Sequence, residues 1–238
     1  VALAHQLVKE GKIGRIYHVR CIYLQEWGGP DTPLLWRFQK KLAGSGAHGD
    51  LNAHIVDMAR FITGDEIVEI SGAISETFIK ERTILAAPSA GGISGGAKGA
   101  AKKGKADVDD AVLFLTRFKK GAVGSFEASR LATGYQNQNG IEVHGEKGAL
   151  RFRFEDMNRL HYYDATADAS VQGWTDIMCT DGSHPYVRHW WPAAHILGYE
   201  HGFVNQAADI MRVLAGQEPE VPVVTFADAY ETQRVLEA

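Results

Sequence analysis

Asp50 and His54 are the two residues whose types and spacing most directly indicate chemistry. They stand four residues apart in a segment expected to be helical, so their side chains should lie on one face, one turn apart. A carboxylate beside an imidazole can orient the ring and raise its basicity, as an acid–base pair requires. Ordinary explanations also exist, because acids are common in the first turn of a helix and histidines at half-buried positions. Spacing alone favours these structural explanations.

The segment that would position this pair, residues 50–63, has the pattern of an amphipathic helix. Its apolar side chains recur at helical spacing on one face, and they are Leu51, Ile55, Met58, Ala59 and Ile62. Gly64 follows, and glycine is typical of the residue just beyond the end of a helix. The pair is therefore expected in the first turns of a packed helix.

A glycine motif precedes this helix, because residues 44–49 (GSGAHG) match the pattern G-x-G-x-x-G. In a dinucleotide-binding fold such a loop joins a buried strand to a helix whose N-terminus holds a pyrophosphate. Residues 35–41 (LWRFQKK) do not form a buried hydrophobic strand, and no strand–helix–strand unit follows. We therefore interpret the motif as a tight turn that leads into the helix. Its glycines could also let a ligand approach the backbone closely.

The remaining residues that could bind metal are poorly spaced for it. The histidines at positions 184, 189, 195 and 201 are five or six residues apart, which fits neither one helical face nor a zinc pair well. The two cysteines, Cys21 and Cys179, are distant in the sequence. The sequence therefore predicts no metal site, and it contains no serine-hydrolase, zinc-protease or P-loop motif.

The composition excludes several classes of function. The chain has 238 residues, a formal net charge of −4, 45% hydrophobic and 23% charged residues, as is ordinary for a globular protein. Without a large basic block, general nucleic-acid binding is not expected. No run of about 18 apolar residues is present, so no membrane span is expected. Two cysteines cannot form a disulfide framework, and they fit either a reducing compartment or residues that simply pack. We expect a cytoplasmic protein.

The order of the expected elements predicts an α+β fold. Strands alternate with tight turns through the middle of the chain, as in an antiparallel meander, and are expected over 14–24, 67–76, 110–118, 122–130, 140–145, 149–154 and 160–164. Helices are expected over 1–11, 50–63, 199–215 and 226–238. The Gly/Ala/Lys-rich residues 86–107 are expected to form a mobile loop.

These elements give an open, mainly antiparallel β-sheet with helices on one face. The other face would meet water or a second copy of the chain. The sequence does not decide which face of the sheet carries the side chains of Phe114, Phe126 and Phe152.

Several segments together resemble the C-terminal domain of the glucose–fructose oxidoreductase / inositol dehydrogenase / rhizopine-catabolism (Gfo/Idh/MocA) family. The matching segments are residues 7–27, 35–64, 127–152, 191–217 and 226–238. The most specific of them is 35–64, which contains a Trp-Arg dipeptide followed by the D-x-x-x-H pair. The resemblance implies that residues 1–238 form the substrate-binding and oligomerisation domain of an enzyme that carries out redox chemistry with NAD or NADP. An N-terminal Rossmann domain, which this sequence lacks, would hold most of the cofactor.

The resemblance also assigns roles to individual residues. His54 matches the histidine that accepts the proton of the substrate hydroxyl, and Asp50 matches the acid that binds this hydroxyl and orients the histidine. Trp36 and Arg37 match residues beside the nicotinamide and the substrate, so Arg37 is expected to bind cofactor as well. Asn52 stands where many relatives have glycine and is expected to contact substrate.

The substrate that we expect is a sugar, glycoside, anhydrosugar or cyclitol. Aromatic and amide side chains suit hydroxyl-rich rings, and the candidates are Gln25, Trp27, Gln136, Asn137 and Asn139. The resemblance further implies a homodimer or homotetramer through the open sheet face. Two alternatives remain, namely an NAD-dependent glycosidase that works by oxidation and elimination, and a non-catalytic oligomerisation module.

Overall fold

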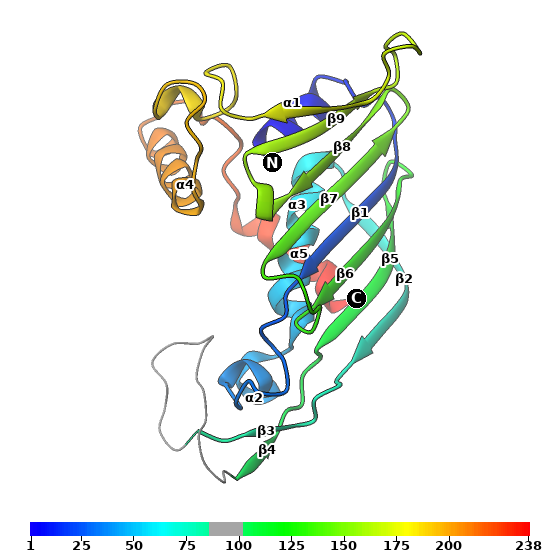
Figure 1. The fold of residues 1–238 in the computed structure, drawn as a ribbon, viewed down its shortest axis with the longest axis vertical. Helices are drawn as coiled ribbons and strands as arrows, with labels where there is room; N and C mark the ends of the chain where they lie inside the picture. Colours follow the sequence, from blue (N-terminus) through cyan, green and yellow to red (C-terminus); the bar gives the residue numbers. More distant parts are fainter. Residues whose placement is uncertain (86–101) are drawn as a thin grey trace.

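A computed structural model of the chain describes residues 1–85 and 102–238. Its main feature is an eight-stranded sheet in the order β10-β9-β8-β7-β1-β6-β5-β2 (Figure 1). The strands are β1 Ile16–Leu24, β2 Ile67–Glu76, β5 Ala111–Phe118, β6 Val123–Ser129, β7 Gln138–Gly145, β8 Gly148–Arg153, β9 Arg159–Asp164 and β10 Trp174–Met178. Every neighbouring pair is antiparallel except β1 with β6, so the predicted open, mainly antiparallel sheet is confirmed.

The helices lie on one side of this sheet, as predicted (Figure 1). They are α1 Ala2–Lys9, α2 Lys40–Ala43, α3 Ala53–Thr63, α4 Tyr199–Leu214 and α5 Phe226–Glu237. Helix α3 is central, because it contacts β1 and β7 on one side and α1 and α5 on the others. Within residues 1–85 and 102–238, no helix has both the length and the apolar character needed to cross a membrane.

The core lies between α3 and the sheet, and alternation along the strands decides which side chains enter it. The rings of Phe114 and Phe126 stack at 5.0 Å between centroids, because their residues are paired across β5 and β6. Phe152 is also buried. All three phenylalanines therefore face the helices, which settles the question that the sequence left open.

Three short strands were not expected from the sequence. Besides β10, these are β3 (Glu81–Thr83) and β4 (Lys103–Lys105), which pair with each other. Of the expected loop 86–107, residues 86–101 lie outside the described part of the chain. Residues 103–105 form β4 instead of a loop, and the sequence of this strand, KGK, has no apolar alternation that could have predicted it. Gly104 packs closely on Leu34, because a Cβ on this glycine would lie 2.5 Å from the leucine side chain.

The parallel pairing of β1 with β6 sets the position of the polar residues at one edge of the sheet. It aligns Leu24 with Ser129, so both strands end side by side, and the backbone N–H of Gln25 continues the pairing by donating to Ser129 at 2.9 Å. Strand β7 begins at the same edge, with Gln138 opposite Leu24. The segments after β1, after β6 and before β7 therefore converge.

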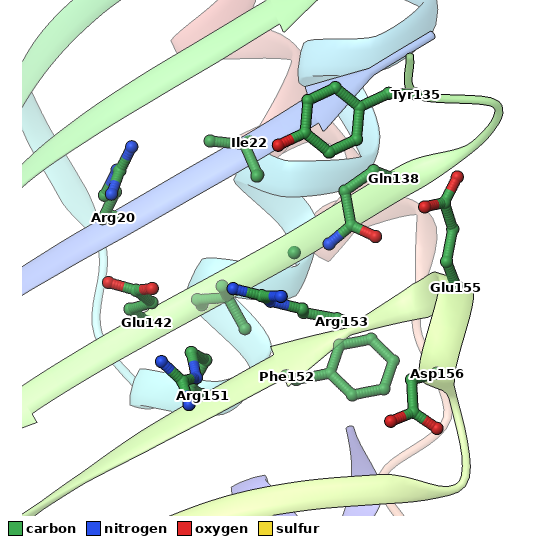
Figure 2. A pocket seen from close by; sticks show the side chains of 12 residues that line it. Arg20, Ile22, Tyr135, Gln138, Glu142, Arg151, Phe152, Arg153, Glu155 and Asp156 are labelled. Atoms are coloured by element: carbon green, nitrogen blue, oxygen red, sulfur yellow. The ribbon is translucent and has the colours of Figure 1, made fainter.

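The face of the sheet that points away from α3 is open. It carries a hollow of about 410 Å³ whose side chains come from β1, β7, β8 and the turns before β7 and after β8 (Figure 2). Arg20 of β1, which contributes to it, alternates with the buried Cys21, so the hollow lies on the opposite face from α3. It is therefore separate from the residues near Asp50.

Helices α3 and α5 are joined by a nearly buried arginine. The side chain of Arg60, 4% exposed, donates to Glu66 at 2.7 and 3.0 Å, to the backbone oxygen and carboxylate of Asp228 at 3.0 and 2.8 Å, and to Thr232 at 2.9 Å. Hydrogen bonds from Arg60 hold the pKa of Glu66 below its ordinary value. This single side chain thus links three segments of the chain.

We expect Arg60→Met to lower the free energy of unfolding by about 1–3 kcal/mol at neutral pH, because buried hydrogen-bond acceptors lose a charged donor. The deficit should begin to shrink as the pH falls through the ordinary Glu pKa of about 4.3, where the unfolded chain takes up a proton first, and the contribution of Glu66 is lost once the pH falls below the lowered pKa of the folded state. Urea unfolding at several pH values measures this. Arg234→Ala, which removes an exposed pair with Glu231, should change stability by less than about 0.5 kcal/mol. Equal losses for both variants would contradict the assignment.

Candidate active site

The glycine motif forms a turn whose backbone donors are already occupied. The Asp109 carboxylate accepts hydrogen bonds from the backbone N–H groups of Gly46 and His48 at 2.8 and 2.7 Å, and its backbone oxygen accepts from Ala47 at 3.0 Å. A Cβ on Gly46 would lie 1.8 Å from that oxygen, so this contact needs glycine. The interpretation as a tight turn is confirmed, since an acidic side chain fills the position that a phosphate would need.

Helix α3 does not begin as a regular helix. Residues His48–Asn52 form a π-helical turn, and α3 continues from Ala53. In such a turn the backbone hydrogen bonds span five residues rather than four, so the angle about the helix axis between Asp50 and His54 differs from that in an α-helix. π-helical turns occur frequently at functional sites.

His54 projects from the first turn of α3 and is exposed. Its ring lies edge-on to that of Tyr23 on β1, with 5.7 Å between the centroids. It makes no hydrogen bond with any residue of the described ranges. Its imidazole nitrogens are therefore available to a ligand.

Asp50 is held by two arginines rather than by His54. Arg37 Nη1 lies 3.2 Å from each carboxylate oxygen, and Arg130 Nη2 lies 2.8 Å from Oδ2. That Asp50 helps to orient the imidazole stays a prediction, and no hydrogen bond joins the two side chains in the structure. The physical reason is that two charged donors converge on the carboxylate, and charge-assisted hydrogen bonds are the stronger ones.

Arg130 is the residue of this site that the sequence reasoning missed. It stands directly after β6, its side chain is 1% exposed, and it also donates to the backbone oxygen of Arg37 at 3.1 Å. Its guanidinium lies 5.2 Å from the Trp27 ring and 5.8 Å from that of Phe38. A lone arginine after a strand normally indicates a solvated position. Only the pairing of β6 with β1 reveals that it is enclosed.

Trp36 and Arg37 form a surface beside Asp50. The Trp36 residue is 48% exposed, and the Arg37 guanidinium lies 4.8 Å from its indole ring. The structure therefore brings Trp36, Arg37 and Asp50 together next to the start of α3. A planar indole and a fixed guanidinium can receive a flat, polar ring.

Four of the predicted polar side chains meet at the edge where β1 ends and β7 begins. Trp27 Nε1 donates to Gln25 at 2.6 Å, and Gln25 Nε2 donates to Asn137 at 2.7 Å. Asn137 also accepts from the Tyr23 hydroxyl at 2.9 Å, and Asn139 lies opposite Tyr23 in the β1–β7 pairing. Burial, with a further contribution from the charge of Asp50, raises the pKa of Tyr23, which keeps its hydroxyl a donor.

Asn52, which was expected to contact substrate, is enclosed by the protein. It is fully buried, and its Nδ2 donates to His48 Nδ1 at 3.1 Å. The other ring nitrogen of His48 then carries the proton and donates to the backbone oxygen of Leu236 at 2.8 Å. Asn52 thus connects the start of α3 to α5 and offers no surface to a ligand.

Among the residues that the structure describes, no group of three or more His, Cys, Asp or Glu side chains could hold a metal ion.

Comparisons with known proteins find a matching family model and several similar proteins. Residues 1–151 match the family model described as the GFO/IDH/MocA C-terminal domain. A levoglucosan dehydrogenase of Pseudarthrobacter phenanthrenivorans is 38% identical over 242 residues, which cover 100% of this chain and 60% of that protein. A 1,5-anhydro-D-fructose reductase of Ensifer adhaerens is 28% identical over 158 residues, which cover 63% of this chain and 38% of that protein.

Solved structures show the same fold. An oxidoreductase domain protein from Kribbella flavida is 50% identical with a TM-score of 0.89, covering 100% of this chain and 60% of that one. A levoglucosan dehydrogenase in complex with NADH and L-sorbose is 37% identical with a TM-score of 0.88, covering 100% of this chain and 59% of that one. The chain thus spans less than two thirds of the length of these relatives.

We expect Asp109→Asn to destabilise the fold by about 1–3 kcal/mol, because one carboxylate oxygen becomes an amide nitrogen that faces a backbone N–H. Asp107→Asn is the matched control, since Asp107 accepts a single backbone hydrogen bond, from Lys40, and asparagine keeps that acceptor. Thermal unfolding followed by circular dichroism compares the two. A smaller loss for Asp109→Asn than for Asp107→Asn would contradict this role.

We expect Arg130→Lys to lower the midpoint of thermal unfolding by several degrees, about 1–2 kcal/mol, because a single ammonium nitrogen lacks the planar fork whose two nitrogens bond Asp50 and the backbone oxygen of Arg37. Arg117→Lys, at an exposed pair with Glu69, should leave the midpoint unchanged. An unchanged midpoint for Arg130→Lys would show that the enclosed guanidinium does not organise the site.

Proposed function

Because the chain belongs to the GFO/IDH/MocA family, we propose that it is the substrate-binding and catalytic-histidine domain of an NAD(P)-dependent oxidoreductase. The complete enzyme acts on a secondary alcohol of a sugar, glycoside, anhydrosugar or cyclitol. The observation that carries this proposal is the exposed imidazole of His54. It lies next to a floor of polar side chains, formed by the Tyr23 phenol and the amides of Gln25 and Asn137, where β1 ends and β7 begins.

His54 acts as the general base in this proposal. Oxidation of a secondary alcohol removes a hydride from carbon and a proton from the hydroxyl oxygen. The unpaired imidazole accepts that proton, while the nicotinamide supplies the hydride acceptor. Tyr23, against the edge of the ring, restricts the orientation of the imidazole.

Asp50 supports this step through the position of its carboxylate. Arg37 and Arg130 fix this carboxylate four residues before His54, where it accepts a hydrogen bond from the substrate hydroxyl. Asp50 also holds Arg37 against Trp36, and this surface is the part of the chain that we assign to the nicotinamide and the substrate.

The cofactor phosphates are assigned to a preceding nucleotide-binding domain. The one glycine motif of this chain is closed to phosphate by Asp109, whereas the Trp36–Arg37 surface fits a nicotinamide ring. The levoglucosan dehydrogenase structure that shares this fold contains NADH, which supports NAD or NADP as the cofactor.

Among the substrate classes, anhydrosugars receive the most support. The names of both relatives, levoglucosan dehydrogenase and 1,5-anhydro-D-fructose reductase, refer to anhydrosugars. A polar floor that contains amides and a phenol suits the neutral hydroxyl groups of such rings.

A second proposal concerns assembly. The open sheet face carries exposed apolar side chains on β2, β5 and β6, namely Ile74, Leu113, Leu115 and Val123. A second copy of the chain would cover them, which supports a homodimer or homotetramer through this face.

We expect His54→Asn in the complete protein to lower kcat by about 10²–10⁴-fold, because the general base is lost. Its unfolding midpoint should stay close to that of the wild type, since the imidazole is exposed. The assay follows reduction of NAD or NADP in the presence of levoglucosan and a panel of sugars and cyclitols. His195→Asn, at an exposed histidine outside the site, is the control.

Two results would contradict the proposal. Full turnover by His54→Asn would remove the imidazole from the mechanism. Cleavage of glycosides with no net change in cofactor would instead support oxidation and elimination.

A further inference from the structure

Arg82 is a fully enclosed arginine on β3, a strand outside the main sheet. Its side chain is 0% exposed. One guanidinium nitrogen, Nη1, donates to the backbone oxygens of Gly29 and Thr32 at 2.8 and 3.1 Å. The other, Nη2, donates to the backbone oxygen of Gly28 at 2.7 Å and lies 3.4 Å from the Asp110 carboxylate. Arg82 therefore holds the turn that follows β1 against the segment that precedes β5.

The two residues that Arg82 Nη2 contacts are also the two that hold the backbone of Arg130. The backbone N–H of Gly28 donates to the backbone oxygen of Arg130 at 3.0 Å. The backbone N–H of Arg130 donates to the backbone oxygen of Asp110 at 2.9 Å. Gly28 packs closely on Arg130, because a Cβ on this glycine would lie 2.9 Å from both the Cβ and the backbone oxygen of the arginine.

The Arg82 guanidinium also supports the rings against which the Arg130 side chain lies. It stands 3.7 Å from the centre of the Phe38 ring, and the Trp27 ring lies 5.5 Å from that of Phe38. The Arg130 guanidinium is 5.2 Å from the Trp27 ring and 5.8 Å from the Phe38 ring. Phe38 is the last residue of the 3₁₀ turn Trp36–Phe38, so the same contact holds this part of the site.

A cation at this position costs stability. Burial lowers the pKa of Arg82, and the like charge of Arg130 acts in the same direction, while Asp110 opposes both. Apolar side chains of similar volume often replace buried charges without loss of stability. The presence of an arginine therefore indicates a role in geometry, for which its planar fork of donors is suited.

We propose that Arg82 is a positioning residue of the candidate active site, which acts through Arg130 on the carboxylate of Asp50. Because Gly28 and Asp110 fix its backbone, Arg130 presents Nη2 to Asp50 Oδ2 at 2.8 Å. A displacement of about 1 Å in such a constellation is enough to slow catalysis substantially. This inference rests on the proposed function, in which Asp50 accepts a hydrogen bond from the substrate hydroxyl.

The first test compares two buried arginines in the complete enzyme. Arg82→Lys keeps the charge but loses the fork, and we expect kcat/KM for the sugar to fall about tenfold or more at a temperature well below the unfolding midpoint. Arg60→Lys makes the same change at a side chain that is 4% exposed and joins α3 to α5, and kcat/KM should stay within a few-fold. An equal change of kcat/KM in both variants, large or small, overturns the proposal.

The second test asks whether Arg82 acts through Arg130. Two residues that act through one contact have non-additive effects, so adding Arg82→Lys to Arg130→Lys should lower kcat/KM by less than about threefold further. An arginine that only stabilises the fold would give losses that multiply, and this result overturns the proposal.

The third test disturbs the same contact without altering an arginine, so it decides the matter if Arg82→Lys does not fold. We expect Gly28→Ala to lower kcat/KM about tenfold, because the new Cβ displaces Arg130. Gly29→Ala is the matched control and should leave kcat/KM unchanged, since the nearest atom to its Cβ would be the backbone oxygen of Glu26 at 3.8 Å. Equal kcat/KM values for the two alanine variants overturn the proposal.

Hydrogen exchange measures this geometry without any turnover. In Arg82→Lys the backbone N–H groups of Gly28 and Arg130 should exchange about tenfold faster than in the wild type, and in Arg60→Lys at the wild-type rate. If the complete protein oxidises no sugar or cyclitol, the proposed function fails, while faster exchange in Arg82→Lys alone still supports the placement of Arg130 by Arg82. If it oxidises a sugar and both variants exchange alike at these groups, only the present inference fails.

Discussion

The parallel pairing of β1 with β6 places the carboxyl ends of two strands, at Leu24 and Ser129, side by side in an otherwise antiparallel sheet. The chain after β1 then supplies Gln25 and Trp27, and the chain after β6 supplies Arg130. An antiparallel partner in place of β6 would put the start of a strand there and move Arg130 to the far edge. The candidate site therefore depends on the single parallel strand pair in this otherwise antiparallel sheet.

Two carboxylates at the start of α3 have separate tasks. Asp109 satisfies the backbone donors of the glycine turn, and Asp50 satisfies two guanidinium groups. Because both carboxylates bond other groups, neither bonds His54, whose imidazole is exposed on the helix surface. The pattern that matches a dinucleotide loop is thus used to start a helix, and its buried contact with Asp109 explains the need for Gly46.

Local patterns were sufficient to predict most elements but not their partners. The bounds of β2, Ile67–Glu76, were predicted as observed, and those of α5 within one residue. The spacing of apolar residues and the turn residues that end an element can both be read from the neighbouring sequence. Strands β3, β4 and β10 are short or lack alternation. The enclosure of Arg130 and the burial of Asn52 depend on residues distant in the chain, which no local pattern encodes. The resemblance pointed to Asp50 and His54, whereas the arginines that hold Asp50 required the fold.

The donor-only indole of Trp27 has a consequence for how such a site can diverge. Replacing it with a side chain that can accept a hydrogen bond would free Gln25, and then Asn137, to turn their amides over. Asn137 would then present its Oδ1 where it now presents its Nδ2, without any change in the residue itself. The orientation of the Asn137 amide is thus set by a residue two side chains away.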